Sequence, residues 1–191
     1  MTTKGMAAAG TKQVRQSRFR YGATAKAKAT VVQARERQMT AFVGRGTGGP
    51  RYFDTVFRYD PLERVQLVKA GVPAQMAVTV AKAMGISKDS LYQTLGLPRA
   101  TIDRKLREGK ALSSDESSRV LGIARLVGQA QAIVEESGDP AGFNAAEWVG
   151  QWLAQPVSAL GGRTPGELMD TAEGQAIVSN LLDRAVSGAY S

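Results

Sequence analysis

Three helix-start signals in this sequence limit the chain to a largely helical fold. Each places a serine, asparagine or threonine three residues before a glutamate, at Ser113–Glu116, Asn144–Glu147 and Thr164–Glu167. In such a capping box the first side chain accepts a bond from the helix backbone, and the glutamate returns one. Apolar residues at helical spacing are found throughout the same region, and glycines such as Gly71 and Gly85 supply stops. The pattern predicts an all-α protein.

The C-terminal stretch, residues 138–191, has the pattern of a small helical unit. Its first helix should end at Pro156, because proline has no N–H to donate and clashes with the preceding turn. Gly161-Gly162 then supply the backbone freedom for a turn. Thr171 should cap a last helix, and Gly188 is a plausible stop at its C-terminal end.

Both tryptophans of the chain, Trp148 and Trp152, lie four residues apart in this unit. Large aromatic side chains are first expected in a core, where they bury the most apolar surface. The alternative is that part of this surface is a protein interface, since aromatic anchors dominate interface energetics. The two interpretations are compatible if one tryptophan is buried and the other faces a partner.

The middle of the chain carries a helix, a short turn and a basic helix in succession. Ser87 caps the first helix, Gly96-Leu97-Pro98 forms the turn, and Arg99–Arg107 forms the second helix. This is the helix-turn-helix arrangement, whose second helix enters the major groove of DNA. Ile102 and Leu106 lie four residues apart and should face the core, which leaves the basic residues on the outer side.

The outer side of this basic helix offers candidate DNA contacts. Six residues are expected to contact DNA: Arg99, Thr101, Arg104, Lys105, Arg107 and Lys110. Arginine and lysine in the middle of the helix can read guanine edges, whereas those at its ends are better placed for phosphates. Asp103 and Glu108 add negative charge to the same region, so a solvated face that binds no DNA is the alternative.

Three further helices complete the middle region. The helix that begins at Pro61 is expected to bury Leu62, Val65, Leu67 and Val68 on one face. Pro73 is expected to open the next helix, which ends at Gly85. The long helix after Ser113 has wide apolar coverage, enough to pack against the helices before it or against a second copy of the chain. A homodimer is therefore expected, through this helix or through the C-terminal unit.

The first part of the chain, residues 1–51, is strongly basic. It holds eleven of the 25 lysines and arginines and one of the 17 acidic residues. Few large apolar residues are available there, so a flexible arm is expected. Cations and aromatics interleave at Arg18–Tyr21, which suits backbone tracking and base stacking on nucleic acid. A solubilising tail with no defined target is the alternative, and a mitochondrial-type presequence, similar in composition, ranks below both.

Composition excludes several classes of function. The chain has no cysteine and no histidine, which removes disulfides, thiol catalysis, ordinary zinc sites and the commonest general acid/base. The carboxylates are scattered, so no catalytic residue, metal site or cofactor is predicted, and the chain is not expected to be an enzyme. No apolar run approaches the ~20 residues of a membrane span and no signal peptide begins the sequence, so a cytoplasmic location is expected.

A two-part motif extends over about residues 58–190. Its members are Gly96-Leu97-Pro98, Thr101, Arg104, Leu112-Ser113, Glu116-Ser117, Arg119, Leu160-Gly161-Gly162, Thr164-Pro165, Thr171, Gly174, Val178, Leu182, Arg184 and Gly188. In order and spacing these residues resemble the Xre-like antitoxins, the ParS/MbcA-like group that pairs with RES-domain toxins. The basic arm lies outside the pattern.

The resemblance implies an Xre-like helix-turn-helix and dimerisation domain at residues 52–137 and a toxin-binding domain at residues 138–191. It implies the antitoxin of a bacterial type II pair, which blocks the active-site cleft of a RES-domain toxin and represses its own operon by binding operator DNA as a dimer. RES toxins consume NAD⁺, so that chemistry belongs to the partner. The residues expected to contact the toxin are Trp148, Trp152, Leu160, Gly161, Gly162, Arg163, Thr164, Arg184, Gly188 and Tyr190.

The basic helix departs from the family's usual pattern. Many members resemble RTLxRR there, whereas this chain has Asp103 and Lys105 within Ala100–Lys105. The sequence therefore does not define the operator. The alternative function is a free-standing helix-turn-helix regulator without a toxin partner, whose C-terminal unit dimerises or senses something else. A toxin gene beside this one would discriminate between the two.

Overall fold

The computed structural model describes residues 50–137 and 140–186. Apart from one isolated bridge between Pro73 and Ala111, every regular element in these ranges is helical. In chain order the elements are α2 Pro50–Arg58, α3 Pro61–Ala70, α4 Gln75–Ala83, α5 Lys88–Thr94, α6 Arg99–Arg107, α7 Ser114–Ser137, α8 Ala145–Trp152, the 3₁₀ turns η1 Ser158–Leu160 and η2 Pro165–Leu168, and α9 Ala172–Val186. The all-α prediction is confirmed.

The helix starts follow the capping signals of the sequence. Ser87 accepts a bond from the Ser90 backbone N–H at 3.0 Å, and α5 begins directly after it. Asn144 accepts from the Glu147 backbone N–H at 3.3 Å and opens α8. Thr171 does the same for α9. Each signal needs only residues three apart, which explains why local sequence was enough to locate these starts.

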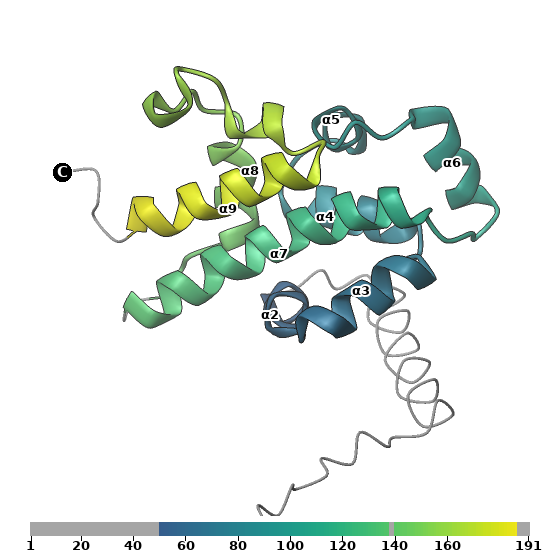
Figure 1. The fold of residues 1–191 in the computed structure, drawn as a ribbon, viewed down its shortest axis with the longest axis horizontal. Coiled ribbons are helices and arrows are strands. Elements are labelled where there is room, and N and C mark those ends of the chain that lie inside the picture. Colours follow the sequence, from purple (N-terminus) through teal and green to yellow (C-terminus); the bar gives the residue numbers. More distant parts are fainter. Residues whose placement is uncertain (1–49, 138–139, 187–191) are drawn as a thin grey trace, which may run out of the picture.

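Helix α7 is the central element of the fold. Figure 1 shows it crossing the molecule, with α9 along one side and α2 and α3 along the other. It contacts α2, α3, α4, α8 and α9. Most of its apolar side chains are buried, including Val120, Ile123 and Val127. α7 therefore supplies the surface on which both the N-terminal and C-terminal helices pack.

One hydrophobic cluster joins the two halves of the chain. Leu91 and Ile102 of the helix-turn-helix share it with α7 and with Val149, Met169 and Val178 of the C-terminal part. The core thus continues across residue 138, where the sequence analysis placed a domain boundary, and that division remains a prediction. A displacement of one half of the protein is therefore transmitted to the other half through α7.

Helix α2 was not predicted from the sequence, which indicated a flexible arm up to residue 51 and a helix that begins at Pro61. Tyr52, Phe53 and Val56 are almost fully buried between α2 and its neighbours. α2 carries no recognisable start box, and its partner helix α7 lies about seventy residues further along the chain. Its formation therefore depends on long-range packing that local patterns do not reveal.

The expected apolar face of α3 is only partly correct. Leu67 is buried, but Leu62 is 75% exposed and Val65 46% exposed. Residues two positions apart on a helix point to nearly opposite sides. α3 packs on α7 with its Leu67 side, so Val65 faces outward. The prediction was therefore wrong for Leu62 and Val65, whereas Leu67 is buried and Val68 packs against the core.

Two other expectations change for physical reasons. α8 ends at Trp152, four residues before Pro156, and the chain continues in a short turn. Thr164 and Glu167 form the expected capping box, but it opens a single 3₁₀ turn. The long helix, one of the two expected dimer surfaces, packs against α2, α3, α8 and α9 of its own chain, and the homodimer stays a prediction.

Candidate functional site

Two helices, α5 and α6, form the helix-turn-helix predicted from the sequence. The turn between them is possible because Gly96 adopts a left-handed conformation with φ of 58°. Leu91, Leu95 and Ile102 are fully buried beneath it. The same packing leaves the opposite side of α6 facing outward at the edge of the molecule (Figure 1).

The outer side of α6 is a cationic surface. Four of the predicted DNA contacts are exposed: Arg99, Arg104, Arg107 and Lys110. Thr101 is half-buried beside them. A row of exposed cations on a helix that projects from the fold is the arrangement that phosphate contacts require.

Ion pairs offset the negative charge of Asp103. Its carboxylate accepts a hydrogen bond from Lys88 at 2.8 Å and lies 3.8 Å from Arg99. The bond from Lys88 holds the pKa of Asp103 below its usual value. Arg99 also pairs with Asp89 at 3.1 Å. Asp103 therefore orients the side chains of Lys88 and Arg99 at the edge of the surface. The sequence pattern did not indicate that Lys88 takes part.

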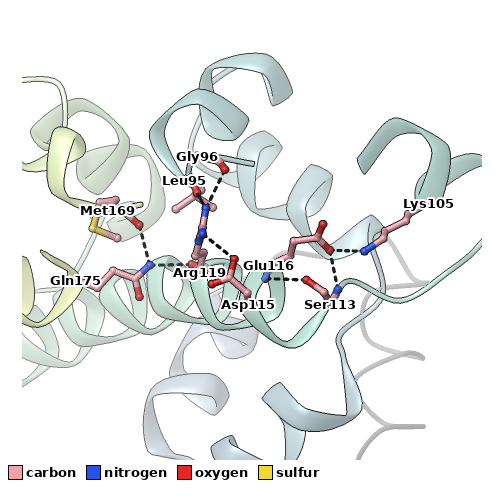
Figure 2. A network of polar contacts seen from close by, with 9 residues as sticks. All are labelled: Leu95, Gly96, Lys105, Ser113, Asp115, Glu116, Arg119, Met169 and Gln175. Carbon is pink, nitrogen blue, oxygen red and sulfur yellow. Dashed lines mark hydrogen bonds and ion pairs between the residues drawn. The ribbon is translucent and has the colours of Figure 1, made fainter. Parts of the chain in front are cut away.

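Lys105 does not belong to the exposed surface. Its side chain is only 17% exposed and forms an ion pair with Glu116, whose side chain is 10% exposed. Glu116 also accepts a bond from the Ser113 backbone N–H at 2.7 Å (Figure 2). The expectation that Lys105 reads base edges has to be dropped, because its ammonium group is directed to the start of α7.

The two tryptophans form a stacked pair at the surface of the C-terminal part. Their ring centroids lie 5.7 Å apart at an angle of 10°, and Phe143 lies 6.1 Å from Trp148. Trp152 packs against the core, whereas Trp148 is 37% exposed. Phe143, Trp148 and Trp152 together form a row of three neighbouring aromatic rings. One tryptophan is thus supported by the core while the other is accessible.

The turn between η1 and η2 is held by its own backbone. Gly161 and Gly162 adopt left-handed conformations, and Gly162 donates to Val157 at 3.1 Å. Val157 donates in turn to the Arg163 carbonyl at 3.0 Å, which leaves the Arg163 side chain exposed. The predicted toxin contacts Leu160 and Thr164 are half-buried in the same region.

The last predicted contacts lie at the end of α9. Arg184 is exposed there. Gly188 and Tyr190 lie outside the residues that the structure describes. Ile177, also on α9, is 43% exposed and was not anticipated as a surface residue, because its spacing fits the buried face of the helix.

Comparison with known proteins identifies both halves. Residues 63–125 match the antitoxin Xre-like helix-turn-helix domain, and residues 129–188 match the antitoxin Xre/MbcA/ParS C-terminal toxin-binding domain. The Prs ADP-ribosylating antitoxin of a Sphingobium species is 40% identical over 157 residues, which cover 82% of this chain and 99% of that protein. The chain belongs to the Xre antitoxin family.

More distant relatives agree with this assignment. Antitoxin Xre of Yersinia enterocolitica is 26% identical over 127 residues, covering 66% of this chain and 80% of that protein. Antitoxin Xre of Photorhabdus laumondii is 23% identical over 125 residues, covering 65% and 79%. This Xre antitoxin therefore has a toxin as its partner, and its helix-turn-helix implies DNA binding. The family is one of binding proteins, not of enzymes.

The family domains meet within α7. The first match ends at residue 125 and the second begins at residue 129, so the match to the toxin-binding domain includes the last nine of the 24 residues of that helix. No helix in the described part of the chain is both long and apolar enough to span a membrane.

Proposed function

We propose that this antitoxin neutralises a RES-domain toxin that consumes NAD⁺, by covering the toxin's active-site cleft with its C-terminal part. The Sphingobium relative's name refers to ADP-ribosylation, a reaction whose donor is NAD⁺, which supports this class of toxin. We further propose that the antitoxin binds its own promoter through α6, as a homodimer, and represses transcription.

The exposed face of Trp148 is the observation that carries the toxin half of the proposal. A rigid aromatic side chain, stacked on a core-supported neighbour, contributes large contact area at low entropic cost. The other proposed contacts lie along the same C-terminal part: Leu160, Gly161, Gly162, Arg163, Thr164, Arg184, Gly188 and Tyr190. An exposed aromatic group that is held by a core-supported neighbour is typical of a protein interface.

The test is co-purification of the full-length antitoxin with the product of the adjacent gene. Trp148→Glu should weaken the complex by at least about thirtyfold, because central aromatic anchors contribute about 2 kcal/mol or more. Leu62→Glu is the matched control, since it also places a carboxylate at an exposed apolar position but on α3. Loss of affinity with Leu62→Glu, or retained affinity with Trp148→Glu, would contradict the proposed surface.

The DNA half is tested with arginines on α6. Arg107→Ala should weaken binding to a fragment from upstream of the gene and reduce the slope of log affinity against log salt by about one. Arg163→Ala removes an exposed arginine from the C-terminal part and should leave the slope unchanged. If both variants change the slope equally, the DNA surface does not lie on α6.

The homodimer is proposed because helix-turn-helix proteins usually bind two half-sites, one per subunit. The mass of the free antitoxin by light scattering tests it directly. A free-standing regulator without a toxin is the second candidate, and failure of the adjacent gene product to bind the wild-type antitoxin, with promoter binding intact, would favour it.

A further inference from the structure

A polar network connects the helix-turn-helix to the toxin-binding domain through a single residue of α7 (Figure 2). The Arg119 guanidinium donates to the backbone carbonyls of Leu95 at 3.1 Å and Gly96 at 2.8 Å. It also pairs with Asp115 at 2.6 Å, and its side chain is 25% exposed. Leu95 and Gly96 belong to the turn directly before α6, so Arg119 fixes the point from which the DNA-facing helix starts.

The backbone of the same residue is held from the other side. The side-chain amide of Gln175, on α9, donates to the Arg119 carbonyl at 3.2 Å and to the Met169 carbonyl at 2.9 Å. Gln175 can reach this position because Gly122 has no side chain. A Cβ at Gly122 would lie 1.7 Å from the Gln175 amide oxygen. Gln175 therefore joins α7 to the corner of the toxin-binding domain that precedes α9.

The turn also touches this corner directly. A Cβ at Gly96 would lie 3.1 Å from the Arg119 guanidinium and 3.2 Å from the Asp170 Cβ. Further along α6, the ion pair between Lys105 and Glu116 ties that helix to the start of α7. Both attachments of α6 thus lead to the first turns of α7, where Gln175 is bound.

We propose that Arg119 is a positioning residue for DNA recognition, and that Gln175 makes its position depend on the Met169–Gln175 corner of the toxin-binding domain. The proposal rests on the proposed DNA binding by α6. A partner that shifts this corner would change the orientation of α6, and by thermodynamic reciprocity DNA would change the affinity for that partner by the same factor. Arg119 acts through the turn and need not contact DNA itself.

A second glutamine provides a matched control. Gln129 also bridges α7 and α9, donating to Ser179 at 3.1 Å and to Asp183 at 2.6 Å and accepting from the Ser179 hydroxyl at 2.7 Å. It lies almost three turns further along α7 than Arg119, and these two partners are both on α9, not in the turn at Leu95 and Gly96. Replacing either glutamine with methionine keeps side-chain length while removing the bridge.

The experiment measures DNA preference for the full-length chain. We would compare its affinity for a labelled fragment from upstream of its own gene with that for a scrambled fragment of equal length. The ratio of the two affinities is independent of the folded fraction, because the same folded molecules bind both probes. A residue that only stabilises the fold therefore leaves the ratio unchanged.

Gln175→Met and Arg119→Met should each lower this ratio by about fivefold or more, the range expected for coupled sites. Gly122→Ala should have the same effect, because its methyl group displaces the Gln175 amide. The double variant Arg119→Met/Gln175→Met should lose no more than the larger single effect, since the two residues act in one network. Gln129→Met should stay within about twofold of the wild type, as expected for an independent site.

An unchanged ratio in Gln175→Met and Gly122→Ala, or an equal loss in Gln129→Met, would overturn the inference while leaving the proposed function intact. A wild-type chain that shows no preference for the upstream fragment would remove the DNA half of the proposed function and this inference together. The two failures are therefore distinguishable in one set of measurements.

Discussion

Glu116 shows how a single buried carboxylate organises the DNA-binding half. It accepts bonds from Lys105 and from the Ser113 backbone N–H, and its own backbone N–H donates to the Ser113 hydroxyl at 3.2 Å. Burial alone would raise the pKa of Glu116, but the bonds from Lys105 and Ser113 outweigh it, so the pKa lies below its usual value. The charged form is thus the one that the fold stabilises.

Glu116→Gln should lower the free energy of unfolding by about 1–3 kcal/mol at about pH 7, because it weakens charge-assisted bonds and leaves Lys105 partly buried without its counter-ion. Because the pKa of Glu116 is lower in the folded protein than in the unfolded chain, its carboxylate stabilises the fold fully at pH values above the unfolded pKa, about 4.3. That contribution is lost as the pH falls through the folded pKa. The difference between wild type and variant should therefore shrink below about pH 4.3.

Urea unfolding across this pH range measures the effect. Glu136→Gln, at an exposed position of the same helix, should change stability by less than about 0.5 kcal/mol. A Glu116→Gln difference that stays constant from neutral to acidic pH would show that packing, not charge, makes the residue important.

Side-chain roles were predictable only where the partners are close in sequence. The caps at Asn144 and Thr171 bond to residues three positions away, so their sequence signals were sufficient. Lys105 looked like a base-reading residue because its partner, Glu116, lies on another helix. Nothing in the helical spacing around Lys105 indicates that contact. The sequence likewise did not decide whether Trp148 is exposed. Helical spacing indicates the face of α8 on which this side chain lies, but not which other residues cover that face.

At the level of elements, the contact between α2 and α7 depends on Gly128. A Cβ at this position would lie 2.2 Å from the Phe53 carbonyl oxygen and 2.6 Å from the Phe57 Cβ. The first of these contacts is to backbone, which cannot move aside as a flexible side chain can. The two helices therefore approach more closely than any larger residue allows.

Gly128→Ala should destabilise the protein by about 1–3 kcal/mol, the usual cost of overpacking, although alanine favours a helix. The unfolding midpoint in urea is the readout. Glu136→Ala, on an exposed part of α7, should change it little. A Gly128→Ala variant as stable as the wild type would mean that α2 does not dock tightly on α7.

Helices were predicted correctly from the sequence where clear start and stop signals lie near their ends. The helices from α3 to α9 have caps, prolines or glycines near their ends, and their existence was predicted. α2 also begins at a proline, Pro50, but without a capping side chain this signal was not enough to distinguish a helix start from the end of a loop. In α3, Leu62 and Val65 were wrongly assigned to the buried face, because amphipathic spacing is ambiguous over ten residues. Which apolar residues become core depends on the position of α7, a property of the whole chain.

For the whole molecule, the shared core predicts that the toxin-binding part cannot be removed cleanly. A chain that ends at Ser137 loses Val149, Met169, Val178 and Leu182, all of which pack against the common cluster. Exposing their contact surface on α7 should abolish cooperative unfolding or lower the melting temperature by at least about 10 °C, since each lost core side chain contributes ~2 kcal/mol or more. Circular dichroism during heating tests this, and a cooperative, equally stable truncation would show that the helix-turn-helix folds alone.

The distribution of charge gives a contrasting prediction for the other end of the chain. The described core begins at Tyr52, so a chain that starts at Pro50 keeps α2 and every buried side chain of the cluster. Its melting temperature should match that of the full-length chain within a few degrees. The same deletion removes ten of the 25 lysines and arginines and one acidic residue.

Because neutralised phosphates each contribute about 0.9 to the slope of log affinity against log salt, deleting residues 1–49 should reduce that slope by several units if the arm binds DNA. The candidate base-reading residues, Thr101 and Arg104, remain on α6, so affinity should fall by a similar factor for upstream and scrambled fragments. An unchanged slope would identify the arm as a solubilising tail, whereas a lower preference ratio would mean that sequence recognition extends beyond α6. Affinities of both chains for both fragments, measured at several salt concentrations, separate these outcomes.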